Sequence, residues 1–262
     1  RPDAGGGQRD YGYTTAPLVY GEWLIVEVGS DQGTLMAYDK RTGVSVWASD
    51  CTDPAGHAGG LVPMTVEGVP CVAVVTLHRL VVVRLDEDRV GETVATYDWQ
   101  THYANNITTP AAAGDSIILS SSYNINRTER VRITLTGAEK MWALVGRCTG
   151  VCSPMVYGGH VYLAWRRVVC VDFETGKLKW EGSSVQADGS CLVTGDGRLI
   201  VLASKKLRLV ETAERSPEAY TELSAKTGVG SNWNWPHVVV ASGRILAKDL
   251  DGNLMCFELR GE

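Results

Sequence analysis

Aromatic, imidazole and amide side chains gather in stretches of the sequence where no regular strand is expected. The most distinctive stretch is Trp233-Asn234-Trp235-Pro236, because two indoles in a loop rich in Gly, Ser and Asn are costly to expose without a use. Such side chains bind by stacking and by charge-assisted hydrogen bonds, which suits a sugar polymer, a peptide or an acidic group. The candidate binding residues are His57, His102, Tyr103, Asn105, Asn106, Tyr123, Arg166, Trp233, Asn234, Trp235 and His237.

Two alternatives to ligand binding remain open for these residues: they are ordinary solvated loop residues, or one tryptophan has a structural role. Polar loops collect His, Asn and Arg without any ligand, because loop backbone and side chains are solvated. One of the two indoles, Trp233 or Trp235, also fits as a buried tryptophan between sheets, which residues 190–223 would otherwise lack.

Motifs for catalysis and for metal binding are missing from the sequence. It contains no Gly-x-Ser-x-Gly, no His-Glu-x-x-His and no phosphate-binding glycine loop followed by Lys. The segment Asp249-Leu-Asp251-Gly-Asn253 superficially resembles a calcium loop, but it lacks the following bidentate Glu and falls where a hairpin turn is expected. We therefore predict no catalytic residue and no metal site.

The seven cysteines leave the redox compartment open. Cys170 and Cys256 lie in apolar strand patterns and are expected to be buried thiols. Cys148 and Cys152 are the one closely spaced pair, for which a disulfide and two free thiols both remain possible. No second Cys or His pair with zinc-site spacing accompanies them.

Composition indicates a globular protein, expected to form one domain over residues 1–262. The formal charge of −5 argues against nucleic acid as the main partner. No apolar stretch approaches the roughly 20 residues of a transmembrane helix, so no transmembrane segment is predicted. The first ten residues are polar and glycine-rich and lack the apolar core of a secretory signal.

A repeated hairpin organises the chain. In residues 33–50, Asp39 is followed by Thr42-Gly43 and then by Trp47, and in residues 168–182 Asp172, Thr175-Gly176 and Trp180 have the same order. In each copy the glycine supplies the positive φ that such a turn needs, and the threonine can hydrogen-bond the local backbone. Helical periodicity is nearly absent, whereas Trp47, Trp99, Trp142 and Trp180 recur at intervals of about 40 to 50 residues, the length of a four-stranded propeller blade.

The sequence thus predicts an all-β fold, a β-propeller of four-stranded antiparallel blades with about six blades visible. The sixth repeat lacks an outer strand, so the chain is expected to form either a six-bladed ring closed by its first residues, or part of a seven- to eight-bladed ring without its amino-terminal blades. The expected repeats cover residues 17–47, 61–99, 110–142, 154–180, 190–223 and 237–259.

The segments GTLMAYDKRTGVSVW and RVVCVDFETGKLKW resemble the repeat of the pyrroloquinoline-quinone-like propellers: an apolar strand, Asp, a Thr-Gly turn and a docking Trp. The resemblance covers most of the chain as a series of blades and is sharp in these two. It implies that Trp47, Trp142 and Trp180 pack between adjacent blades as structural residues.

That family contains quinone-dependent dehydrogenases and non-catalytic propellers resembling the outer-membrane assembly lipoprotein. A dehydrogenase is expected to show a vicinal Cys-Cys pair, which this chain lacks, and its length is below that of the catalytic members. The resemblance therefore implies a non-catalytic, monomeric scaffold without a cofactor, periplasmic or otherwise extracytoplasmic, that binds a protein, peptide or glycan through one loop-rich face. The alternatives are an alcohol or sugar dehydrogenase that uses pyrroloquinoline quinone (PQQ) with calcium, and an accessory domain of a polysaccharide-processing protein.

Overall fold

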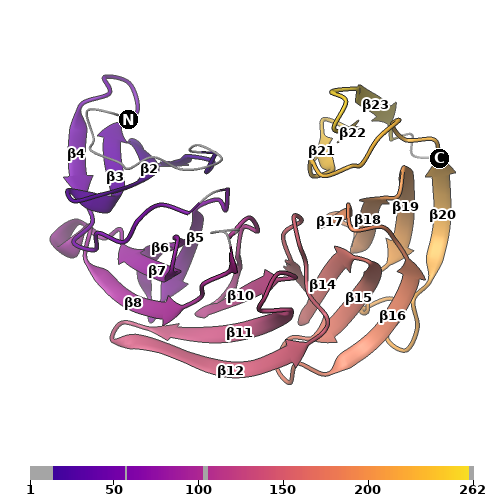
Figure 1. Ribbon diagram of the computed structural model, residues 1–262, viewed down its shortest axis with the longest axis horizontal. Coiled ribbons are helices and arrows are strands. Elements are labelled where there is room, and N and C mark those ends of the chain that lie inside the picture. Colours follow the sequence, from indigo (N-terminus) through magenta and orange to yellow (C-terminus); the bar gives the residue numbers. More distant parts are fainter. Residues whose placement is uncertain (1–13, 57, 103–105, 260–262) are drawn as a thin grey trace. The chain divides into compact units, whose positions relative to one another are not determined.

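The computed structural model describes residues 14–56, 58–102 and 106–259, and in this part of the chain the structure is built from antiparallel sheets (Figure 1). Five sheets have four strands and one has three. Each sheet takes its strands from one continuous stretch of chain, so we call the sheets blades 1 to 6 in chain order. The chain divides into two compact units, Arg1–Ala143 and Leu144–Glu262, which are described separately.

Unit 1 holds blades 1 to 3 and a short 3-10 helix, η2 (Glu87–Arg89). Blade 1 consists of β1 (Leu18–Tyr20), β2 (Trp23–Ser30), β3 (Gly33–Asp39) and β4 (Ser45–Ala48); blade 2 of β5 (Val62–Val66), β6 (Val69–Val75), β7 (Arg79–Arg84) and β8 (Thr93–Asp98); and blade 3 of β9 (Ala111–Ala113), β10 (Ser116–Ser121), β11 (Arg127–Thr134) and β12 (Gly137–Val145).

Unit 2 holds blades 4 to 6, and the three-stranded sheet is blade 6. Blade 4 consists of β13 (Met155–Tyr157), β14 (His160–Trp165), β15 (Arg167–Asp172) and β16 (Leu178–Ser184); blade 5 of β17 (Ser190–Val193), β18 (Arg198–Ala203), β19 (Lys206–Glu211) and β20 (Glu222–Thr227); and blade 6 of β21 (Val239–Ala241), β22 (Arg244–Lys248) and β23 (Leu254–Glu258).

The middle strands of blades 1 to 5 are largely buried on both faces, which explains their nearly continuous apolar sequences. In β6, Val72 and Val74 belong to the core shared with blade 1, whereas Cys71, Ala73 and Val75 belong to the core shared with blade 3. Successive side chains of a strand point to opposite faces, so one strand contributes to two cores.

Unit 2 repeats this arrangement around blade 5. Leu199 and Val201 of β18 pack in the core shared with blade 4, while Ile200 and Leu202 pack in the core shared with blade 6. All four side chains are 2% exposed or less. The apolar runs therefore indicate stacked sheets, not a sheet with one face in water.

The two sharp sequence repeats form the same turn. Asp39 Oδ1 accepts hydrogen bonds from Thr42 N (2.7 Å) and Thr42 Oγ1 (2.8 Å), and Asp172 Oδ1 accepts them from Thr175 N (2.8 Å) and Thr175 Oγ1 (2.6 Å). These bonds hold the pKa of both aspartates below the usual value. The glycines that follow, at positions 43 and 176, have φ of 73° and 69°, a region that other residues rarely adopt.

The repeated tryptophans differ in burial. Trp47 packs in the core shared by blades 1 and 2, with its ring centroid 5.8 Å from that of Trp23. Trp180 packs in the core shared by blades 4 and 5, between Tyr162 and Tyr220 at 6.0 and 5.8 Å. Trp142 departs from this pattern, because it lies partly exposed on β12.

The all-β fold, the four-stranded antiparallel blades and their number of about six confirm the sequence prediction, with local differences. The outer strand of blade 5 is β20, at Glu222–Thr227, whereas the predicted fifth repeat ends at residue 223. Cys256 was expected to be buried but is exposed, because it lies on the face of β23 opposite Ile245 and Phe257, and that face packs against nothing in the described part of unit 2. An apolar strand pattern alone cannot tell a terminal sheet from a covered one.

We expect Trp180→Ala to lower the free energy of unfolding by about 3–5 kcal/mol, because it empties a buried site between two tyrosines. Trp180→Phe should cost much less, since it keeps an aromatic ring there and removes an indole N–H that has no hydrogen-bond partner. Urea denaturation measures both, with Trp142→Ala as the partly exposed control. Equal losses for Trp180→Ala and Trp142→Ala would contradict the assignment of Trp180 to the core.

Candidate functional site

In unit 2, the connection from β20 to β21 contains two solvent-exposed indole side chains. The side chains of Trp233 and Trp235 are 43% and 39% exposed, their ring centroids lie 5.5 Å apart, and their planes are inclined by 56°. An exposed pair of this kind is unusual, because transferring an indole from water into an apolar environment lowers the free energy. Trp233 and Trp235 are therefore the strongest binding candidates in the described residues.

Asn234, between the two indoles, is fully buried and anchors the loop. Its Oδ1 accepts from Lys205 N at 3.1 Å, its Nδ2 donates to the carbonyl oxygens of Val229 and Lys248, both at 3.4 Å, and its backbone N donates to Asp188 Oδ2 at 3.4 Å. A buried amide with these partners is satisfied by the protein. Asn234 thus holds the loop from a buried position, whereas the sequence predicted it to be a binding residue.

The residues before the indoles are fixed to the turn between β22 and β23. Ser231 N donates to Asp249 Oδ2 (2.8 Å), Asn232 Nδ2 donates to Asp251 Oδ1 (2.7 Å), and the carbonyl of Trp233 accepts from Leu250 N (3.0 Å). The segment with a superficial likeness to a calcium loop is this turn, and its carboxylates are engaged by the loop.

The residues after the indoles are held as well. His237 is exposed, yet its Nε2 accepts from the backbone N of Ser153 at 3.1 Å, which requires that nitrogen to be unprotonated. Val238 N donates to Ser190 Oγ at 3.0 Å. The loop is fixed before, between and after the indoles. Binding a ligand there therefore costs little additional entropy for ordering the loop.

Asp249 is the most highly connected group in this network. It accepts from Ser231 N, Ser231 Oγ, Asn253 N and Asn253 Nδ2 at 2.8–3.2 Å. The hydrogen bond from Asn253 and those from Ser231 stabilise the carboxylate and hold the pKa of Asp249 far below its ordinary value. Asp249 is therefore charged at neutral pH without a described cationic partner.

One apolar residue and two basic residues lie on the segments that are bonded to the loop of the indoles. Leu250 is 45% exposed and bonded through its backbone to Trp233, and we call Trp233, Trp235 and Leu250 the aromatic patch. Lys205 and Lys248 are both exposed, and the backbone of each is bonded to Asn234. Within the described residues neither lysine has an ion-pair partner. The patch is thus apolar, with charges of both signs on the segments that anchor it: these two lysines, and the carboxylates of Asp249 and Asp251.

The remaining predicted residue of unit 2 is Arg166, which lies exposed at the turn between β14 and β15. Its φ of 60° is left-handed, and its backbone is paired with the β16–β17 connection through Val185 and Gln186. No described contact joins it to the aromatic patch.

The predicted binding residues of unit 1 lie in different environments. Asn106 is buried, and its Nδ2 donates to the carbonyls of Thr76 (2.7 Å), Trp99 (3.2 Å) and Leu77 (3.3 Å), so it ties two connections together as Asn234 does in unit 2. His102 is exposed and Tyr123 is half-buried. The last three predicted residues, His57, Tyr103 and Asn105, lie outside the described residues.

Sequence reasoning missed two aspartates that organise the connections between blades: Asp188, which is buried, and Asp53, which is half-buried with its side chain 8% exposed. Asp188 accepts from Ser204 N at 3.0 Å as well as from Asn234, and Asp53 bonds Thr76 Oγ1 and lies 3.2 Å from His78 Nδ1. Asp188 precedes a Gly and Asp53 a Pro, a signal that also describes ordinary turns. Sequence alone therefore could not separate them from solvated loop carboxylates.

The close cysteine pair shows no functional chemistry. All seven cysteines are free thiols, and Cys148 and Cys152 are buried. Desolvation raises the pKa of Cys148 to about 11 and that of Cys152 further still, so neither is a reactive thiolate at neutral pH. Over residues 14–56, 58–102 and 106–259, no group of three or more His, Cys, Asp or Glu side chains is arranged to hold a metal ion.

Comparison with solved structures decides the fold. BamB from Moraxella catarrhalis superposes with a TM-score of 0.66 over 94% of this chain and 69% of its own, at 15% identity. The chain has the β-propeller fold. The WD40 domain of Sif2 (TM-score 0.64, 9% identity, 95% of this chain and 69% of that one) and the designed protein Ika8 (0.68, 10%, 94% and 71%) agree.

A dehydrogenase is a more distant structural neighbour. The quinohemoprotein alcohol dehydrogenase ADHIIG from Pseudomonas putida gives a TM-score of 0.51 at 13% identity, over 75% of this chain and 41% of its own. At sequence identities of 9–15%, these similarities support the fold and nothing more specific. No protein-family model and no curated protein sequence matches the chain.

The described part of the propeller contains no helix long and apolar enough to cross a membrane.

We expect Asp249→Asn to lower the midpoint of thermal unfolding at neutral pH, because an amide cannot accept all four bonds made by the carboxylate. The pKa of Asp249 is lower in the folded than in the unfolded chain, so its contribution to stability is present above about pH 4 and is lost as pH falls further. The variant should lose less stability than the wild type over that acid range. Melting followed by circular dichroism measures this, with the exposed Glu218→Gln as control, and parallel curves for wild type and Asp249→Asn would contradict it.

Proposed function

We propose that this chain is a non-catalytic propeller scaffold that binds an extended peptide or a loop of a protein partner through the aromatic patch. The single observation that carries the proposal is the exposure of Trp233 and Trp235 on a loop fixed by buried hydrogen bonds. Exposed, rigid aromatic side chains are the typical anchors of protein interfaces, because they bury a large area at low entropic cost.

The geometry favours a peptide over a glycan. Stacking a sugar chain along two indoles needs faces that lie nearly in one plane, whereas these planes are inclined by 56°. With Leu250 beside them, the rings instead suit an aliphatic, proline or aromatic side chain. A protein ligand that inserts such a side chain fits the patch best.

The charges beside the patch favour an acidic ligand. Lys205 and Lys248 are held next to Asn234 and exposed, and no described carboxylate pairs with either. Exposed cations near an apolar contact attract acidic segments and repel basic ones, whereas the carboxylates of Asp249 and Asp251 already accept hydrogen bonds from the loop. We infer that the bound segment carries Asp or Glu close to its apolar anchor.

The type of repeat and the location of the protein belong to the same proposal. The matched Asp-Thr-Gly turns of blades 1 and 4, with Trp47 and Trp180 packed between blades, support a repeat of the PQQ-like type. That resemblance also leads us to propose a monomeric protein in the periplasm or another extracytoplasmic compartment.

Selection from a random peptide library displayed on phage tests the function directly. We expect the enriched peptides to carry an acidic residue near a large apolar one, and Trp233→Ala or Trp235→Ala to weaken their binding at least about tenfold, as truncation of an aromatic anchor does. Added salt should weaken binding further. Trp142→Ala, another partly exposed tryptophan, is the control.

Peptides that bind wild type and both patch variants equally would contradict the assignment of the patch. Selected peptides without acidic residues, and insensitive to salt, would contradict the inferred charge preference.

The alternative function is tested by cofactor uptake. The scaffold proposal includes no cofactor, so we expect the absorbance spectrum of PQQ with calcium to stay unchanged on adding the protein, and dye-linked turnover of simple alcohols and aldoses to be absent. Stoichiometric uptake with turnover would replace the scaffold by a quinoprotein dehydrogenase.

A further inference from the structure

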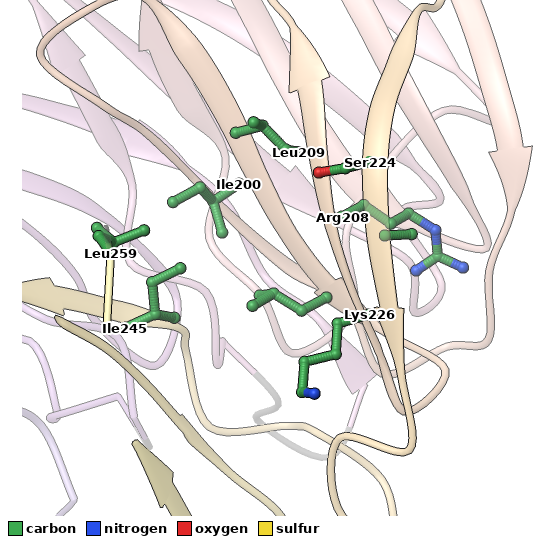
Figure 2. A pocket seen from close by; sticks show the side chains of 9 residues that line it. Ile200, Arg208, Leu209, Ser224, Lys226, Ile245 and Leu259 are labelled. Carbon is green, nitrogen blue, oxygen red and sulfur yellow. The ribbon is translucent and has the colours of Figure 1, made fainter. Parts of the chain in front are cut away.

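A cavity of about 260 Å³ lies in unit 2 between blades 5 and 6 (Figure 2). Its apolar lining comes from Ile200, Leu207 and Leu209 on one side and from Ile245 and Leu259 on the other. No residue of the aromatic patch lines it. The cavity is therefore a separate feature, and a ligand bound in it is independent of the proposed peptide ligand.

The strand register determines which polar side chains share the face of the cavity. Leu209 is paired with Ser224, and Leu207 with Lys226. Residues paired across an antiparallel ladder project from the same face, so Ser224 and Lys226 stand on the cavity side of β20. Figure 2 shows the amino group of Lys226 at one end of the group of apolar side chains.

Lys226 is a cation available for a ligand. It is exposed, its Nζ lies 5.5 Å from the centroid of the Phe257 ring, and no described carboxylate lies within ion-pair distance. Arg208, the other basic residue of the lining, is buried, and its Nη1 donates to the carbonyls of Ala203 (2.8 Å) and Lys206 (3.2 Å), with Glu222 Oε2 3.5 Å from its Nε. The guanidinium is thus engaged inside the blade.

We propose that this cavity binds an amphiphile with a carboxylate head and a medium-length alkyl chain, a fatty-acid-like ligand. The alkyl chain lies between Ile200, Ile245 and Leu259, and the carboxylate pairs with Lys226. A volume of about 260 Å³ has room for on the order of eight groups the size of a water molecule, which suits a chain of about that many carbons. The apolar lining and Lys226, the available cation among the described lining residues, give complementarity at both ends of such a ligand.

Octanoate and its neutral analogue octanamide form the matched pair of probes. Titration into the full chain, followed through isoleucine methyl signals in NMR, should give saturable shifts for Ile200 and Ile245. We expect octanoate to bind roughly five-fold or more tightly than octanamide, since the partly desolvated charge pair adds to the burial of the chain. Equal affinities, or no saturable shift, would overturn the proposal.

Two variants locate the ligand. Lys226→Met keeps the length of the side chain and removes the charge, so it should weaken octanoate about five-fold and leave octanamide unchanged, while Lys177→Met, an exposed lysine on blade 4, should alter neither. Ser224→Trp places a ring over the cavity from an exposed position and should abolish binding of both probes. An unchanged melting curve shows that each variant is folded, and undiminished octanoate binding in folded Lys226→Met and Ser224→Trp would overturn the proposal.

Discussion

Burial of the middle strands of blades 1 to 5 on both faces is the constraint on which this structure depends. Within each unit, a strand such as β6 or β18 supplies alternate side chains to two cores, so these blades bury their apolar faces only against neighbouring blades. The connections between blades must then hold neighbouring sheets in their packed positions. The buried side chains of Asn106, Asn234, Asp53 and Asp188 meet that demand by hydrogen-bonding backbone or side-chain groups of adjoining connections.

The fold could be predicted from sequence because its signals are local. The Asp-Thr-Gly turn at Asp172 needs only a few consecutive residues, and the structure shows the same hydrogen bonds at Asp39. The spacing of the tryptophans set the size of the repeats, but it did not distinguish the buried Trp180 from the partly exposed Trp142. That difference depends on which surface packs against β12, and the sequence of the strand does not contain this information.

The candidate site could be predicted only in part. Composition was enough to single out Trp233 and Trp235, because exposed indoles are costly anywhere. It could not separate them from Asn234, which has the same loop context and points inward. The contributions of Leu250, Lys205 and Lys248 were out of reach as well, since hydrogen bonds between distant segments bring them to the loop.

Anchoring and exposure alternate residue by residue through the loop 233–235. The side chain of Asn234, in the middle, is fixed by hydrogen bonds to the rest of the fold. The side chains of Trp233 and Trp235, on either side of it, take no part in these bonds. The outer pair can therefore be exchanged for other side chains without altering the path of the backbone. A propeller of this kind is a template for new specificities, in evolution or in the laboratory, with two variable positions on a constant frame.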